Sequence, residues 1–181
     1  VGSIADLLLA ARRAPLSLVA SGALSAGERR RLSDAGINAD AADNLRGLAL
    51  AANLVHTDDR ALLTTESTER WLASSFAERW TLLAEAFRDA LPRGVRDGEG
   101  WIPATGWPGA HPWNTTWPAQ ADELRRRAVL LGLETATGTE PAWASSIRTG
   151  GPVDATALSA LLPSEVDRVF LQNDLTAIAP G

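Results

Sequence analysis

The hydrophobic pattern begins with helical spacing and then changes to the alternation that is typical of a strand. Ile4, Leu7 and Leu8 lie on one face of a helix. Pro15 ends that helix because its ring and its missing N–H do not fit a helix interior. We therefore predict an N-terminal helix over residues 1–14, with a short strand directly after it.

The next stretch carries helix starts and stops. Ser25 and Glu28 have the spacing of a capping box, and Gly36 stands where a helix C-cap is expected. Leucines and alanines recur at helical spacing over 38–52, and two short apolar runs then flank residues 57–60, as in a hairpin. Strand, helix, helix and hairpin follow one another in the order of a winged helix, in which the hairpin is the wing.

A second capping box, at Ser75 and Glu78, precedes the most regular apolar stripe of the chain. The stripe predicts an amphipathic helix that ends near Leu91, and it consists of Phe76, Trp80, Leu83 and Phe87. Pro92 then opens a segment rich in Gly, Pro and Trp, which we predict to be a loop over 92–117. A connection this long inside a domain is expected to be either packed or functional.

The remaining residues loosely repeat this order. A helix is predicted from near Pro118, with an apolar stripe formed by Leu124, Ala128 and Leu131. Residues 130–147 resemble a degraded second hairpin that leads into a short helix, and another short helix is predicted over 154–162. At 169–181, two apolar runs flank a polar turn and predict two short strands.

These elements predict a mainly helical α+β fold with short hairpins and winged-helix-type modules. We divide the chain into an N-terminal helix (1–14), a winged-helix-like domain with a C-terminal amphipathic helix (15–91), the loop (92–117) and a second region (118–181). We expect the second region to be helical and winged-helix-like, and to end in the first strands of a truncated α/β domain.

Composition excludes several classes of protein. The 181 residues include no Cys, so neither a disulfide scaffold nor a thiolate metal site is possible. No signal peptide opens the sequence, and no apolar run is long enough to cross a bilayer. We therefore expect a cytoplasmic protein with no membrane partner. The chain also lacks Met, and we expect it to be a segment of a longer protein.

Catalytic motifs are missing from the sequence. All 17 basic residues are arginines, so a phosphate-binding loop with its lysine is impossible, and no G-x-S-x-G elbow occurs. His56 and His111 lie in different segments, and neither has the context of a metal-binding motif. We predict that this segment is not an enzyme and holds no cofactor or metal.

Arginines are the candidate nucleic-acid contacts. Because the net charge is −5, any contact with DNA phosphates must rest on a local basic patch. The candidates are two helical triplets, one residue on the would-be recognition helix and one on the wing: Arg29, Arg30, Arg31, Arg125, Arg126, Arg127, Arg46 and Arg60. The alternative is that the triplets are solvated helix faces paired with Glu28 or Glu123. Asp40 and Asp43 also make the first turns of the would-be recognition helix acidic.

Four tryptophans cluster in the predicted loop, namely Trp101, Trp107, Trp113 and Trp117. They suggest either a stacking platform for bases or sugars, or a Pro-rich loop held to the domain by buried indoles. A site for single-stranded nucleic acid also needs cationic side chains along the phosphate backbone, and only Arg93 and Arg96 lie near the tryptophans. We therefore favour packing.

Two sequence stretches resemble a known family. The end of the chain, LPSEVDRVFLQNDLTAIAPG (162–181), contains LQNDLTAIAPG, and LLTTESTERWLASSFAERWTLLAEAF (62–87) lies upstream. The first resembles the signature of the actinobacterial helicase-associated, XPB-type N-terminal-domain proteins. The second is similar to their wing and helix more loosely, with Ser75 and Phe76 in place of the usual prolines.

The resemblance implies winged-helix-like modules followed by a small α/β domain, akin to the DNA-damage-recognition region that precedes the motor in XPB helicases. It does not imply helicase activity, because no motor motif lies in this segment.

Two functions are therefore expected for this repair- or transcription-related protein. In the first, the chain is a non-catalytic module that binds double-stranded or forked DNA. In the second, it is a scaffold whose winged helix packs against another domain or protein and does not bind DNA.

Overall fold

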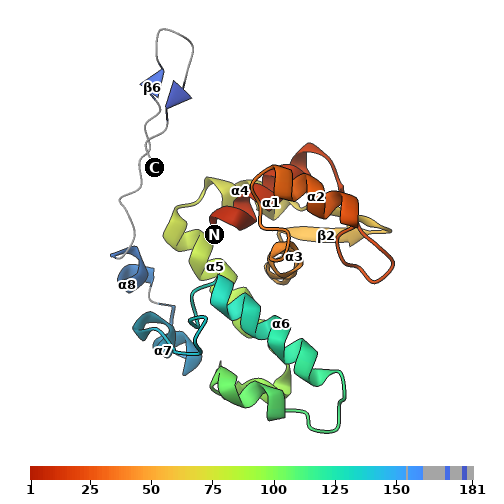
Figure 1. The fold of residues 1–181 in the computed structure, drawn as a ribbon. Helices are drawn as coiled ribbons and strands as arrows, with labels where there is room; N and C mark the ends of the chain where they lie inside the picture. The colour runs from red at the N-terminus through yellow and green to blue at the C-terminus, as the bar shows by residue number, and fades with distance from the viewer. Residues whose placement is uncertain (154, 161–169, 172–176, 179–181) are drawn as a thin grey trace.

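The computed structural model describes residues 1–153, 155–160, 170–171 and 177–178. Its first part consists of α1 (Gly2–Arg13), β1 (Leu16–Ser17), α2 (Ala26–Asp34), α3 (Ala42–Ala51), β2 (Val55–Asp58) and β3 (Ala61–Thr64). Strand β3 pairs antiparallel with β1 on one side and β2 on the other, so the sheet order is β1-β3-β2. The predicted succession of helix, strand, two helices and hairpin is confirmed (Figure 1).

Local chemistry explains where several of these elements begin and turn. The Ser25 hydroxyl accepts the Glu28 N–H at 3.2 Å and caps α2, while the Glu28 carboxylate turns away and binds Arg31. Between β2 and β3, Asp59 adopts a φ of 50°, a left-handed conformation that Asp tolerates better than most residues. That conformation lets the chain reverse within two residues.

The second part is mainly helical. It contains α4 (Glu66–Ala73), α5 (Phe76–Asp89), η1 (Arg93–Val95), β4 (Arg96–Asp97), β5 (Gly100–Trp101), η2 (Ala104–Gly109), α6 (Trp117–Leu130), α7 (Ala142–Arg148) and α8 (Ala155–Ser159). The mixed α+β class is thus confirmed. Helix α4 is an addition to the predicted elements, and α5 begins with the full capping box expected at Ser75 and Glu78.

The segment 92–117 is more structured than the predicted loop. Two 3-10 helices flank the β4–β5 hairpin, and the indole N–H groups of Trp107 and Trp117 bind backbone carbonyls within the segment. These two hydrogen bonds hold the backbone of the segment to the buried indole rings.

The hairpin expected within 130–147 is absent from the structure of these residues. Gly132, with a φ of 70°, ends α6, and Thr135 and Thr139 close a tight hydrogen-bonded turn before α7. Near the C-terminus, β6 (Phe170–Leu171) pairs antiparallel with β7 (Ala177–Ile178), as predicted. The rest of the family signature lies outside the described residues, as do the two ends of the helix predicted over 154–162.

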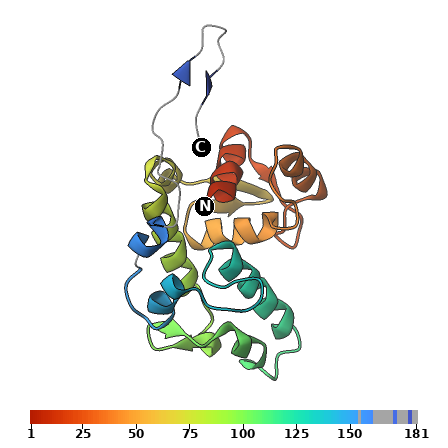
Figure 2. The same ribbon diagram turned by 60° about the vertical axis from the view of Figure 1, so that its left-hand side comes forward.

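Helix α3 lies at the centre of the molecule, between the sheet part and the helical part (Figures 1 and 2). It contacts α1 on one side and α5 and α6 on the other, and one apolar core runs through both parts. The Trp80 indole N–H donates to the Leu131 carbonyl at 2.7 Å and ties α5 to the end of α6. The predicted domain 15–91 and the described residues of the predicted region 118–181 therefore share a core.

We expect Gly100→Ala to lower the free energy of unfolding by at least about 2 kcal/mol through overpacking. A Cβ at Gly100 would lie 1.8 Å from the Arg148 carbonyl oxygen, which belongs to the backbone and cannot rotate away. Urea unfolding followed by circular dichroism measures the loss. Gly109→Ala is the control, because a Cβ there meets nothing within 4 Å, and an equal loss in both variants would contradict this explanation.

We also expect the contribution of Glu78 to stability to depend on pH. Its carboxylate accepts the Ser75 N–H at 2.9 Å, and this backbone hydrogen bond, followed by that from the Ser75 hydroxyl, lowers the pKa of Glu78 below its ordinary value of 4.5. The stabilisation is therefore complete above pH 4.5 and is lost as the pH falls through the lower folded-state pKa.

Thermal unfolding of the parent and Glu78→Gln at a series of pH values tests this. The difference in melting temperature should be present at neutral pH and should shrink in acid. Glu85→Gln, on the same helix, is the control and should show no such trend. A Glu78→Gln difference that is constant across the series would contradict the role of the carboxylate.

Candidate interaction groove between helices α3 and α6

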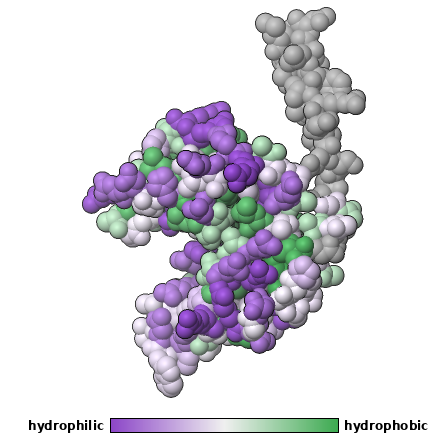
Figure 3. All heavy atoms as spheres, turned by 180° about the vertical axis from the view of Figure 1, so that it is seen from behind, coloured by the Kyte–Doolittle hydropathy of each residue, from purple (hydrophilic) through white to green (hydrophobic). Residues whose placement is uncertain are grey.

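Two adjoining hollows form one groove between α3 and α6. They have volumes of about 490 and about 470 Å³ and share Asp40, Asn44 and Arg126. The other lining residues are Ser21, Ala23, Asn38, Ala41, Asp43, Arg46, Asp122, Glu123, Arg125, Arg127, Val129, Leu130 and Ala136. A space-filling view from behind shows the molecule hollowed between the part that carries α2 and α3 and the part that carries α6 (Figure 3). We call this the α3–α6 groove.

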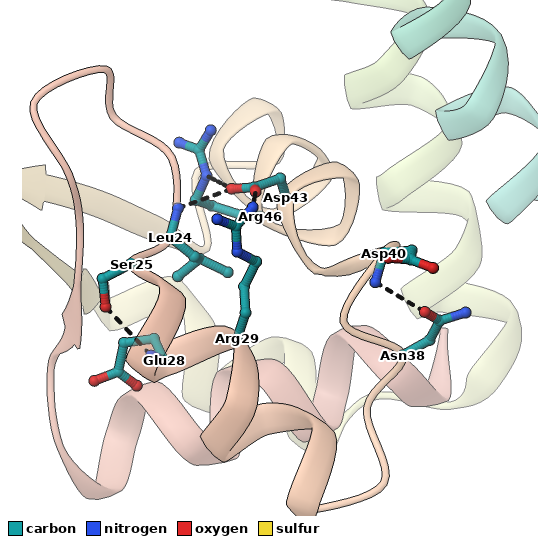
Figure 4. A network of polar contacts seen from close by, with 8 residues as sticks. All are labelled: Leu24, Ser25, Glu28, Arg29, Asn38, Asp40, Asp43 and Arg46. Atoms are coloured by element: carbon teal, nitrogen blue, oxygen red, sulfur yellow. Dashed lines mark hydrogen bonds and ion pairs between the residues drawn. The ribbon is translucent and has the colours of Figure 1, made fainter.

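The α3 wall of the groove is held in place by Asp43. Its carboxylate accepts the Leu24 backbone N–H at 2.9 Å and also contacts the guanidinium groups of Arg29 and Arg46, each at 3.4 Å (Figure 4). Asp43 therefore joins the loop before α2, α2 itself and α3. The acidic residue in the first turn of α3 therefore has a structural role, because its carboxylate already has three partners within the chain.

The α6 wall packs against α3 at Gly47. A Cβ built on Gly47 would lie 2.8 Å from Cζ of Arg127, so the guanidinium occupies the space that a side chain on α3 would need. Burial lowers the pKa of Arg127, Glu123 at 3.5 Å raises it, and nearby Arg46 lowers it further. The Arg127 Nε is buried and has no hydrogen-bond partner among the described residues.

Arg125 holds the far end of α6 against the following turn. Its Nε donates to Oε1 of Glu134 at 2.9 Å, and Glu134 is only 6% exposed. The guanidinium also lies 2.9 Å from a Cβ built on Gly138, whose φ of 85° already favours glycine. Arg125 therefore lines the groove and also stabilises the turn after α6.

The structure brings half of the eight candidate arginines together. Arg46, Arg125, Arg126 and Arg127 line the α3–α6 groove, and Arg29 reaches its Asp43 wall. The remaining three lie elsewhere, on exposed surface of α2 and of the β2–β3 turn: Arg30, Arg31 and Arg60. Five of the eight form ion pairs with other described residues, namely Arg29, Arg31, Arg46, Arg125 and Arg127.

The charges along the groove are balanced. Four arginines face four carboxylates, which belong to Asp40, Asp43, Asp122 and Glu123. Within the described part of the chain, no ion pair is formed by Asp40, Asp122 or Arg126. Beside these free charges the wall is apolar, with Ala41, Val129 and Leu130, and Leu130 is 39% exposed.

Three of the four clustered tryptophans are core residues. Trp101, Trp107 and Trp117 are buried, and Phe87 packs edge-on against Trp101. The indole N–H of Trp117 donates to the Trp107 carbonyl at 2.6 Å. Packing, the favoured explanation of this cluster, therefore describes three members. Trp113 is 94% exposed and lies outside the core.

Sequence reasoning missed part of this site. The loop before α3 contributes Asn38 and Asp40, whose backbone N–H is bound by the Asn38 side chain at 2.9 Å, and α6 contributes Asp122 and an exposed Leu130. Polar residues next to a helix start are read as capping signals, and a leucine in a helix is read as core. Neither pattern identifies a groove wall.

Nothing in the described residues points to catalysis at the groove. His56 is exposed on β2, and His111 packs edge-on against Trp117 at 4.4 Å, so the two imidazoles do not meet. Among all the residues that the structure describes, no group of three or more His, Cys, Asp or Glu is suited to a metal ion. None of the helices in the described residues is both long enough and apolar enough to cross a membrane.

Comparisons with protein-family models, with curated proteins and with solved structures find no match.

We expect Trp107→Ala to destabilise the fold by about 3–5 kcal/mol, because it removes a fully buried indole and leaves a cavity. Trp113→Ala should change the free energy of unfolding by less than about 0.5 kcal/mol, since the side chain is in solvent. Urea unfolding of both variants makes the comparison. Similar losses in the two would contradict the assignment of Trp107 to the core and Trp113 to the surface.

Proposed function

We propose that this chain is a non-catalytic interaction module of winged-helix type from a helicase-associated, XPB-like protein. In this proposal the winged helix is a scaffold, and the α3–α6 groove receives a segment of another protein or of another domain. The XPB-like assignment rests on the sequence resemblance. The observation that carries the interaction role is the position of α6 on the outward face of α3.

The arrangement of elements supports the winged-helix part of the proposal. Helix α1, strand β1, helices α2 and α3 and the β2–β3 hairpin follow one another along residues 2–64, and the sheet order is β1-β3-β2. In this reading α3 is the recognition helix, and the turn at Asp59 and Arg60 is the tip of the wing.

The surroundings of α3 argue against DNA reading through this helix. Its core face carries Leu45 and Leu48, which are buried, so its outward face carries Asp43, Arg46 and Gly47. A recognition helix must enter the major groove, which is about 12 Å wide. Because Arg127 of α6 lies on Gly47, a second helix stands beside α3 where one wall of the DNA groove would have to be.

The charges favour a protein ligand in the same way. Duplex binding depends on cations that neutralise phosphates, whereas the groove has equal numbers of arginines and carboxylates and most of its arginines are already paired. An exposed Leu130 beside the free charges of Asp40, Asp122 and Arg126 is a surface of mixed polarity. Apolar contact surrounded by paired and free polar groups is typical of protein–protein interfaces.

A second candidate function is sequence-independent contact with DNA. Arg30 on α2 and Arg60 on the wing are exposed, and neither forms an ion pair with any described residue. They are the two candidate arginines outside the groove that remain available for phosphates.

Fluorescence anisotropy with duplex, forked and single-stranded DNA at about 50 and about 200 mM salt separates these functions. We expect no binding whose affinity falls with salt, because most of the candidate arginines form ion pairs with described residues. Arg30→Ala/Arg60→Ala is the matched variant for the second candidate. Salt-dependent binding that this variant weakens would favour DNA contact through α2 and the wing and would contradict the scaffold proposal.

A photoreactive benzoylphenylalanine at Ala136, inside the groove, provides the positive test in cells that express the protein. We expect crosslinked products that protease removes and nuclease does not. The same group at Thr115, on an exposed loop, is the control and should give few products. Nuclease-sensitive products at Ala136, or equal yields at both positions, would overturn the assignment of the groove to a protein ligand.

A further inference from the structure

A separate hollow of about 470 Å³ lies at the other end of α3, where this helix meets the outer face of α5. Helix α5 contributes Leu82, Glu85, Ala86 and Asp89 to it, and Ala90, the residue directly after the helix, lies beside them. These positions follow one another at helical spacing and form one stripe. The buried residues of α5 lie on the opposite side, so this stripe is a second face of the helix that faces away from the core.

The stripe is apolar along its middle. Leu82 is 40% exposed, and Ala86 and Ala90 are joined by Ala51, the last residue of α3, and by Ala52 directly after it. Small side chains on both walls allow a third helix to come close, since the distance between packed helix axes depends on the side chains at the contact. The surface thus has the form of a shallow groove that a helix fits.

The charged residues of the hollow are all acidic. Glu85 and Asp89 lie one turn apart, and Glu85 forms no ion pair with the described residues. Asp89 contacts its neighbour Arg88 at 3.2 Å, while Arg96 is engaged by the carbonyls of Asp89 and Leu91 at the end of α5.

The end of α3 also contributes negative charge to the hollow. Ala51 is the last residue of α3, and the C-terminal end of a helix carries a partial negative charge. Two carboxylates and one helix terminus therefore give this hollow a negative electrostatic potential. Cationic side chains of a ligand are complementary to that potential.

We propose that this α3–α5 hollow binds a basic amphipathic helix of a partner protein. The partner helix places an apolar stripe on Leu82, Ala86 and Ala90. Its Arg or Lys side chains, spaced one turn apart, face Glu85 and Asp89. In this mode of recognition an amphipathic helix lies in a groove, and charged residues one turn apart on the partner helix pair with charged residues one turn apart on α5. The surface is distinct from the α3–α6 groove and does not rest on the function proposed for that groove.

Three fluorescein-labelled helical peptides of about 18 residues, or five turns, test the proposal by fluorescence anisotropy. The first has a leucine stripe flanked by Arg and Lys. The second has the same stripe flanked by Glu, and the third has the composition of the first in scrambled order. We expect the first peptide to bind and the other two to bind at least about tenfold more weakly, because both the charge and the pattern are required.

Charge reversal on the protein locates the site. Glu85→Arg/Asp89→Arg should weaken the first peptide at least about tenfold, since both ion pairs become repulsive. Asp34→Arg/Asp58→Arg changes the net charge equally on α2 and the wing, and should leave binding within about twofold. Circular dichroism of both variants verifies folding, and Leu82→Ser is a further site variant that keeps the charge and should also weaken binding.

Several results would overturn the proposal. Equal weakening by the two double variants indicates attraction to net charge alone, and equal binding of the scrambled peptide indicates that no helix face is recognised. Sedimentation of the chain without peptide adds a third outcome. If the chain is a dimer that Glu85→Arg/Asp89→Arg converts to a monomer, the occupant is a second copy and not a basic helix.

Discussion

The contact between Gly47 and Arg127 determines how the two parts of this molecule meet. A glycine in the middle of α3 leaves a space on the outward face of the helix, and the Arg127 guanidinium fills it from α6. Burying an arginine costs solvation free energy, which its lowered pKa reflects, and Glu123 one turn earlier on α6 offsets part of that cost. Around this contact, α3 becomes the central helix, covered by α1, α5 and α6.

That arrangement changes the role of the arginines. Phosphate recognition needs guanidinium groups without a partner inside the protein. Arg125 and Arg127 already have such partners, because Arg125 pairs with Glu134 and Arg127 packs against Gly47 of α3. Asp43 in the same way holds Arg29 and Arg46. What remains available is a surface of mixed charge in the α3–α6 groove, and in the α3–α5 hollow an apolar surface whose charged lining residues are both acidic. Both surfaces are formed on α3, at its opposite ends.

Local signals in the sequence predicted the elements well where a cap or a turn has a chemical cause. Ser75 and Glu78 form the expected capping box, and the chain reverses at Asp59 as the hairpin pattern requires. The same kind of reasoning predicted a hairpin in 130–147 that is not there, because short apolar runs do not distinguish a strand from a turn that Gly132 and buried leucines stabilise.

The amino-acid sequence by itself therefore determined the α+β class, the order of elements in residues 2–64 and the amphipathic face of α5, since each depends on neighbours within a few residues. The pairs of Arg31 with Glu28 and of Arg127 with Glu123 are local to their helices and were among the expected alternatives. Only the tertiary structure decided which arginines meet across the α3–α6 groove. It also decided that Trp107 is buried while Trp113 is exposed, although both stand in the same Pro-rich segment. These outcomes depend on contacts between residues far apart in the chain, such as Gly47 with Arg127, which no local pattern encodes.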